Sequence, residues 1–259
     1  YREYLERFVA EVRPQVLSWD NYMTQVSADM VEPKATARYY QNLLDVRDVA
    51  MQSGLPFWQI VSSNQIRPHT TVPSPANMLL QAYTTLAAGG SSVSWYKYYA
   101  SGYGYAPIDA EGNRTVTWQY LRMVNEQLQV IGPLMNSLQS SGVYFTEGNV
   151  PGELPRLPGR IVKAVGVETP VMVGEFNGDD GADWVMVVNL SLEHSARLRI
   201  DTQEPYKARA LFSPASGKPT ALDEDCSLVP GKPGADGTAP RNGLWLAAGQ
   251  GALLRFGER

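Results

Sequence analysis

One strand–helix–strand unit decides the fold of this chain. It occupies residues 54–96, which read GLPFWQIVSSNQIRPHTTVPSPANMLLQAYTTLAAGGSSVSWY. The apolar run 56–61 predicts a short buried strand, and a second strand is predicted over 92–96. Between them, Ser74 is a good N-cap and Pro75 suits the first position of a helix.

The same alternation extends to both sides of this unit. Helical periodicity predicts helices over 3–13, 34–53 and 117–138, and the apolar run 16–20 predicts another buried strand. Strands that alternate with helices are typical of parallel β-α-β units.

After Pro151 the apolar period changes to two. Short strands are predicted over 161–167, 171–176, 184–189, 196–200, 208–212 and 251–256. This pattern is typical of an antiparallel β-sandwich. We therefore expect an α/β part over residues 1–145 and a sandwich over 146–259, with a Gly- and Pro-rich surface loop over 229–242.

The overall charge limits the classes of partner. The net charge is -4 and the pI is near 5.3, so the sequence gives no electrostatic reason to expect nucleic acid or an anionic membrane. A neutral ligand fits this balance better. No apolar run is long enough to span a membrane, and the compartment stays open between cytoplasm, periplasm and secretion.

Metal and cofactor sites are not expected. Cys226 is the single cysteine, which excludes an internal disulfide and a multi-cysteine metal site. His69 and His194 are too few for a histidine-rich zinc centre.

Four stretches of the first half follow a family pattern. They are PQVLSWDNY at 14–22, YYQNL at 39–43, GLPFWQ at 54–59, and 73–99 with its LAAGG turn. In order and spacing they resemble the C-terminal part of clan-A glycoside hydrolase barrels, above all the β-galactosidase-like enzymes and related uncharacterised bacterial glycosidases. The second half resembles the sandwich that closes many such enzymes.

The resemblance implies a fold. The three predicted strands would be strands six to eight of a TIM-type (β/α)8 barrel, followed by the antiparallel β-sandwich. Because three strands do not close such a barrel, we expect strands one to five upstream of Tyr1. The chain opens without an initiator Met, and this start looks cut.

The resemblance also implies where a catalytic pair would lie. The acid of such enzymes follows strand four, which is not in this sequence, and the nucleophile ends strand seven, near Val61 or Ser62. Neither residue is a carboxylate, so the sequence departs from the two-carboxylate pattern. We expect this portion to supply part of a sugar-binding cleft without the full pair, and to be inactive alone.

Asp20 is the candidate catalytic residue. It is a carboxylate placed at a strand end, where barrel active sites lie, and it could act as acid or base or accept a hydrogen bond from a sugar hydroxyl. The structural alternative is a cap for the following turn. Tyr22, two residues on, is a candidate for substrate binding.

Polar side chains around the next strand are further candidates. Gln59, Asn64 and Gln65 carry amides suited to sugar hydroxyls, and Arg67 and His69 suit a carboxylated sugar such as a uronic acid. Ordinary loop roles are the alternative for all five.

The densest aromatic region follows. Sugar rings stack on aromatic faces, which makes Trp95, Tyr96 and Tyr98 candidate platforms, within a run that also contains Tyr99, Tyr103 and Tyr105. Alternation along a strand places Trp95 on one side and Tyr96 with Tyr98 on the other. One of these sets must pack under helices.

Two readings of the function stay open. The first is the C-terminal portion of a glycoside hydrolase with a carbohydrate substrate. The alternative is a non-catalytic carbohydrate-binding or assembly module. In either case, the first strand would expose a parallel edge, which we expect the upstream barrel half or a second chain to cover.

Overall fold

A computed structural model of the protein describes residues 1–22, 24, 33–100, 102–146, 150, 153–223 and 243–257. Cys226 and the surface loop expected over 229–242 lie outside these ranges.

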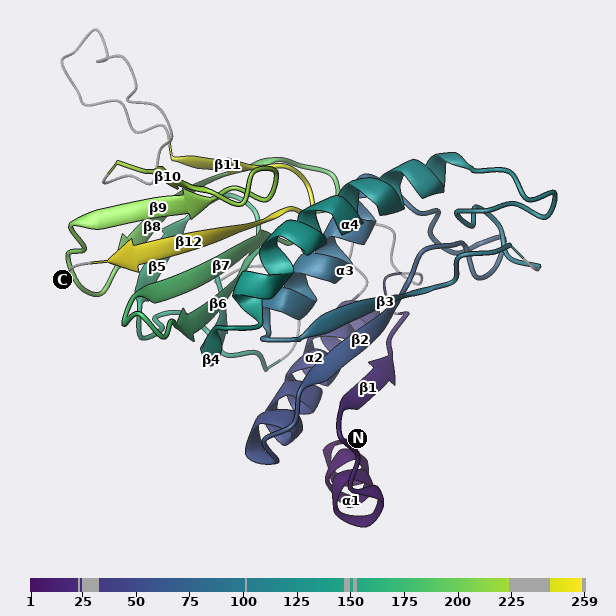
Figure 1. Ribbon diagram of the computed structural model, residues 1–259, viewed down its shortest axis with the longest axis horizontal. Helices are drawn as coiled ribbons and strands as arrows, with labels where there is room; N and C mark the ends of the chain where they lie inside the picture. Colours follow the sequence, from purple (N-terminus) through teal and green to yellow (C-terminus); the bar gives the residue numbers. More distant parts are fainter. Residues whose placement is uncertain are drawn as a thin grey trace, which may run out of the picture.

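Helices and strands alternate in the N-terminal part, as the sequence predicts (Figure 1). The elements are α1 (Arg2–Val12), β1 (Leu17–Asp20), α2 (Pro33–Gln52), β2 (Phe57–Ser62), α3 (Pro75–Ala87), β3 (Ser92–Tyr96) and α4 (Val116–Met135). The strands form a parallel sheet in the order β1-β2-β3. The predicted start of α3 is confirmed, because Pro75 is its first residue and the Ser74 hydroxyl accepts a hydrogen bond from the Asn77 N–H at 3.1 Å.

Antiparallel strands make up the C-terminal part. They are β4 (Gln139–Phe145), β5 (Val162–Gly166), β6 (Val171–Asn177), β7 (Asp183–Asn189), β8 (Ala196–Thr202), β9 (Ala208–Phe212), β10 (Pro219–Ala221), β11 (Leu244–Leu246) and β12 (Gly251–Gly257). A six-stranded sheet has the order β10-β9-β12-β7-β6-β4, and a three-stranded sheet has the order β11-β8-β5. The molecule is thus a mixed α/β protein with one parallel and two antiparallel sheets in its described part.

Three of these strands were not predicted. β4 starts with polar residues directly after a helix and carries an irregularity between Ser140 and Gly142, which disguises its period. β10 and β11 have only three residues each, too few to show alternation. β4 pairs with β6 in the six-stranded sheet, although it precedes the expected boundary at residue 145.

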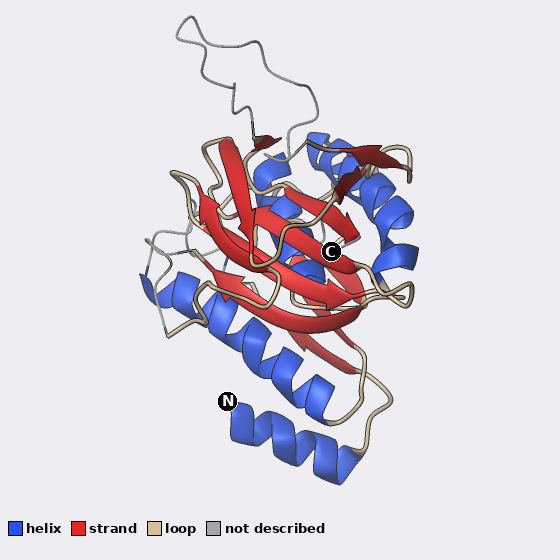
Figure 2. Cartoon of the chain, turned by 90° about the vertical axis from the view of Figure 1, so that its left-hand side faces the viewer, coloured by secondary structure: helices blue, strands red, loops and turns tan. Residues whose placement is uncertain are grey.

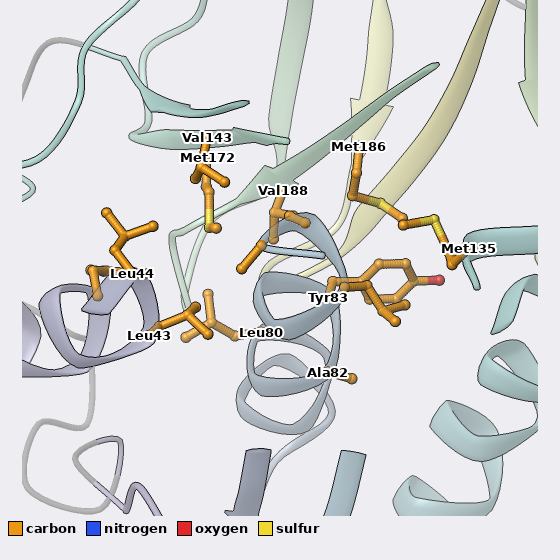
Figure 3. Packing of buried hydrophobic residues seen from close by; sticks show 14 of the residues in the cluster. Leu43, Leu44, Leu80, Ala82, Tyr83, Met135, Val143, Met172, Met186 and Val188 are labelled. Carbon is orange, nitrogen blue, oxygen red and sulfur yellow. The ribbon is translucent and has the colours of Figure 1, made fainter. Parts of the chain in front are cut away.

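α3 is the helix on which the other layers pack. It lies between the parallel sheet and the six-stranded sheet (Figure 1), and every residue from Asn77 to Ala87 is buried. Figure 3 shows part of this core, with Tyr83 of α3 next to Met135 of α4 and Met186 of β7. α3 is thus an interior helix, and its polar residues Asn77, Gln81, Thr84 and Thr85 are buried together with its apolar ones.

Glycines allow the six-stranded sheet to touch the backbone of α3. A Cβ atom at Gly174 of β6 would collide with the carbonyl oxygen of Ala87, and one at Gly251 of β12 would collide with the Tyr83 ring. Both positions need glycine because the helix and the strands approach each other directly.

A second core separates the two antiparallel sheets. Val171 and Val173 of β6 point into it with Leu198 of β8, whereas Met172 and Phe176 point toward α3. β6 is therefore buried on both faces over residues 171–176, and the burial includes Glu175, whose carboxylate accepts hydrogen bonds from the Ile161 and Val162 N–H groups. α1 packs beside α2 at the base of the molecule (Figure 2).

Gly174→Ala tests the contact between α3 and the six-stranded sheet. The added methyl group must push the helix backbone away, so we expect the free energy of unfolding to fall by about 2–3 kcal/mol. Gly132→Ala is the control, because Gly132 lies in α4 with open space around it, and alanine there should stabilise by roughly 0.5–1 kcal/mol. Guanidinium unfolding measures both; equal midpoints for the two variants would contradict the close approach.

Tyr40→Phe tests how burial of a phenol affects stability at high pH. Tyr40 is fully buried between Tyr39 and Phe145, and burial raises the pKa of its phenol well above 10.0. The unfolded chain ionises first as the pH rises, so this contribution is complete below pH 10 and is lost above it. The wild-type free energy of unfolding should fall between neutral and strongly alkaline pH, and we expect this fall to be smaller in Tyr40→Phe. Denaturant unfolding at several pH values measures the difference. An unchanged pH dependence would contradict the role of Tyr40.

Candidate functional site

The carboxyl ends of the three parallel strands meet at one edge of their sheet. Asp20 ends β1, Ser62 ends β2 and Tyr96 ends β3. The register places Ser62 beside Tyr96 and Asp20 beside Ile60, so Asp20 and Tyr96 lie on the same face. That face is the one turned away from the helices, because Leu17 and Trp19 of β1 are buried whereas Asp20 is exposed.

Tyrosines surround Asp20 at this edge. The Asp20 carboxylate contributes to the raised phenol pKa of Tyr22, whose ring centroid lies 5.5 Å from that of Tyr96. The Tyr96 ring stands edge-on to Tyr103 at 5.8 Å, and the two hydroxyls are 3.2 Å apart. Lys97 places its amine 5.0 Å from the Tyr103 ring centroid. We call these five residues the strand-end cluster.

The phenol pKa values of Tyr22 and Tyr96 are raised above their ordinary value, so both hydroxyls stay protonated near neutral pH. Burial, followed by the negative charge of Asp20, raises the pKa of Tyr22. The hydrogen bond with Tyr103 is the main cause that raises the pKa of Tyr96. The cluster therefore offers neutral hydroxyl donors, ring faces and one carboxylate acceptor, a set of groups that matches a polyhydroxyl ligand such as a sugar.

Two predicted binding residues lie on the opposite face of the sheet. Gln59 is fully buried and accepts a hydrogen bond from the Thr85 hydroxyl of α3 at 2.8 Å. Trp95 donates its indole N–H to Asn125 of α4 at 2.9 Å. Both side chains pack under helices, and we leave them out of the strand-end cluster.

The loop after β2 holds four further predicted residues. Asn64 and Gln65 are buried, and the Gln65 amide donates to the Thr70 carbonyl at 2.7 Å, which fixes the loop. Arg67 and His69 are exposed on the same loop. The structure therefore gives Gln65 a local structural contact and leaves the Arg67 and His69 side chains in solvent.

Tyr98 lies apart from the strand-end cluster. Its ring is 52% exposed, and its hydroxyl accepts a hydrogen bond from the Trp118 indole of α4 at 3.2 Å. Of the three predicted aromatic platforms, Tyr96 alone lies with Asp20 and Tyr22.

The sequence reasoning missed the residue that fixes the end of β2. Gln81 of α3 accepts from the Ser62 N–H at 2.9 Å and donates to the Ser62 carbonyl at 3.1 Å and to the Asn77 side chain at 2.8 Å. The signal was present, because Asn77 and Gln81 are amide residues four positions apart in a helix that is mostly apolar. Lys97 and Tyr103 were also left out of the predicted site.

No metal site appears in the described ranges. They contain no group of three His, Cys, Asp or Glu side chains that could hold an ion. Within the same ranges, no helix is both long and apolar enough to cross a membrane.

A comparison with known protein families found a match for the N-terminal part of the chain, which contains the parallel sheet. Residues 3–129 match the model of glycoside hydrolase family 42, described as beta-galactosidase. The N-terminal part of the chain is therefore similar to this glycoside hydrolase family. The match covers all three parallel strands and ends inside α4, whereas the antiparallel sheets lie outside it. A comparison with curated proteins gave no match.

The β-galactosidase resemblance placed the family's nucleophile near Val61 or Ser62. In the structure these residues end β2, with side chains exposed by 0% and 1%. The carboxyl end of β2 therefore carries no carboxylate.

Gln81→Leu tests the support of this strand end. The change leaves the Ser62 N–H and carbonyl without their partner in a buried position, so we expect the free energy of unfolding to fall by about 2–4 kcal/mol. Gln129→Leu, on the exposed side of α4, is the control and should change it by less than about 0.5 kcal/mol. Urea unfolding compares the two, and similar small effects would show that Gln81 does not support β2.

Proposed function

We propose that this chain is the C-terminal portion of a glycoside hydrolase that acts on a glycosidic bond in an oligo- or polysaccharide. In this proposal the strand-end cluster forms part of the sugar-binding cleft. The observation that carries the proposal is the gathering of Asp20, Tyr22, Tyr96 and Tyr103 at the carboxyl edge of the parallel sheet. In barrel enzymes, the active site lies at this edge.

The arrangement of the parallel layer supports an assignment to strands six to eight of a (β/α)8 barrel. The strands follow one another in chain order, and helices cover one face of their sheet. The other face carries exposed Ser18, Asp20 and Ser92, which would point into the barrel. Upstream strands of the same protein, or a second chain, would pair with the free edge of β1.

Asp20 has one of two roles in this proposal. Its carboxylate acts as an acid or base in bond cleavage, or it accepts a hydrogen bond from a sugar hydroxyl. Tyr22, whose phenol pKa is raised in part by the Asp20 charge, lies beside the carboxylate in either case. Val61 and Ser62 at the end of β2 mean that a second carboxylate would have to come from outside this strand.

A non-catalytic carbohydrate-binding or assembly module is the second candidate function. The absence of a carboxylate at the end of β2 favours it, because a retaining glycosidase needs two carboxylates. A glycoside hydrolase turns over its substrate, whereas a carbohydrate-binding or assembly module does not, so a turnover assay separates the two candidates.

Asp20→Asn in the full-length protein tests the role of Asp20. If Asp20 is the acid or base, we expect turnover of its oligosaccharide substrate to fall at least ~10²-fold with little change in affinity. If the affinity for the oligosaccharide falls and turnover falls only in proportion to it, Asp20 has the hydrogen-bonding role. Glu3→Gln, an exposed carboxylate of α1, is the control. Unchanged turnover and affinity would return Asp20 to a structural role.

Tyr96→Ala tests the aromatic wall of the cleft. Loss of a stacking ring should weaken binding of a neutral galacto-oligosaccharide about tenfold. Tyr98→Ala is the matched control, because Tyr98 contacts Trp118 of α4 away from Asp20, and should have little effect. Titration calorimetry measures both. Equal affinities for the two variants would place the sugar elsewhere.

A further inference from the structure

The outer face of the three-stranded sheet carries an exposed tryptophan. Trp245 is the middle residue of β11 and is 64% exposed, whereas its neighbours Leu244 and Leu246 are buried. Strand alternation therefore turns the indole away from the core between the sheets. Tryptophan is enriched at interfaces, because its ring is apolar and its N–H group can form a hydrogen bond.

Two arginines lie on the same face, on the neighbouring strand β8. Arg197 is the direct cross-strand partner of Trp245, and Arg199 is the next outward residue. Arg199 lies opposite Gly166 of β5. A Cβ at Gly166 would be 3.6 Å from the Arg199 Nε and Nη2 atoms, so the guanidinium extends across this glycine.

These side chains line a cavity of about 780 Å³, a size in the range of ligand pockets. Its lining includes Trp245, Arg197, Arg199, His194, Glu168 and Thr169. We call this the outer-sheet pocket. The six-stranded sheet and α3 separate it from the parallel sheet (Figure 1), so it is distinct from the strand-end cluster.

The charges of the outer-sheet pocket favour an anion. Within the described part of the chain, neither Arg197 nor Arg199 forms an ion pair. Glu168 is the one carboxylate among the described residues that line the pocket. Two guanidinium groups against one carboxylate leave a net positive charge, and guanidinium groups bind carboxylates in a planar, bidentate manner.

We propose that the outer-sheet pocket binds carboxylated sugar residues of an acidic oligosaccharide, with a sugar ring on Trp245 and its carboxylate on Arg197 and Arg199. Stacking explains the exposed indole, and the free guanidinium groups explain the preference for a uronate over a neutral sugar. The proposal rests on the proposed function for its choice of a sugar, and it adds the acidic class of ligand and a second site.

Titration of the whole chain with tetragalacturonate tests the proposal, with galactotetraose as the neutral probe. We expect the acidic probe to bind at least about tenfold more tightly, and its affinity to fall as salt rises from about 0.02 to 0.5 M. Trp245→Ala and Arg197→Gln should each weaken it at least about tenfold.

Two control variants locate the binding. Trp118 is also flanked by arginines. The Cζ atoms of Arg114 and Arg122 lie 4.1 Å and 5.9 Å from its ring centroid, so these side chains already cover the ring. Trp118→Ala should leave the affinity unchanged, and so should Arg67→Gln in the exposed loop after β2. Thermal unfolding of each variant verifies that it is folded.

Three results would overturn the proposal: equal affinity for both probes, no heat with tetragalacturonate up to about 5 mM, or loss of binding in Arg67→Gln but not in Trp245→Ala. Asp20→Asn separates this proposal from the proposed function. It should leave tetragalacturonate binding intact even if the strand-end cluster proves to have no role with sugars.

Discussion

The direct contact between α3 and the six-stranded sheet holds the layers of this protein together. Gly174 and Gly251 let the strands approach the helix so closely that a methyl group at either position would collide with it. Close packing of this kind extends the core from the antiparallel sheets through α3 to the parallel sheet. Without this approach, β6 would expose Met172 and Phe176, and α3 would expose the side on which Tyr83 lies.

The same helix sets the geometry of the strand ends. Gln81 holds the backbone of Ser62, and Thr85 holds the Gln59 side chain. The Gln81 amide is buried and hydrogen-bonded through both its oxygen and its nitrogen, which makes it a stiff support. The edge at which Asp20 and Tyr96 gather is thus positioned by a helix that contributes no side chain to the strand-end cluster. In this way, packing in the interior controls the place where a sugar would bind.

The two proposed binding surfaces differ in chemistry because they lie on different sheets. The strand-end cluster offers phenols and a carboxylate, which suit neutral hydroxyl groups. The outer-sheet pocket offers guanidinium groups beside an exposed indole, which suit a carboxylated sugar. A protein with both could hold an acidic polysaccharide at two points, and binding at two linked points strengthens attachment. The family match supports the first surface only, since it ends at residue 129.

The sequence alone predicted most helices and strands and the resemblance to β-galactosidase-like glycosidases, whereas the tertiary structure showed which side chains lie together. Sequence signals are strong where the apolar period and the capping residues predict the same helix, as at Ser74 and Pro75. They are weak where a strand has only three residues, as β11 has, or an irregularity, as β4 has. Asp20, Tyr22 and Tyr96 could be placed together because parallel strands end at one edge of a sheet. The sequence could not show that Gln59 and Trp95 lie on the opposite face of the sheet from Asp20. Side-chain alternation along a strand defines two faces, but it does not say which face the helices cover. Trp245 carried no signal at all, since its exposure and its position opposite Arg197 depend on a strand pairing between residues 48 positions apart.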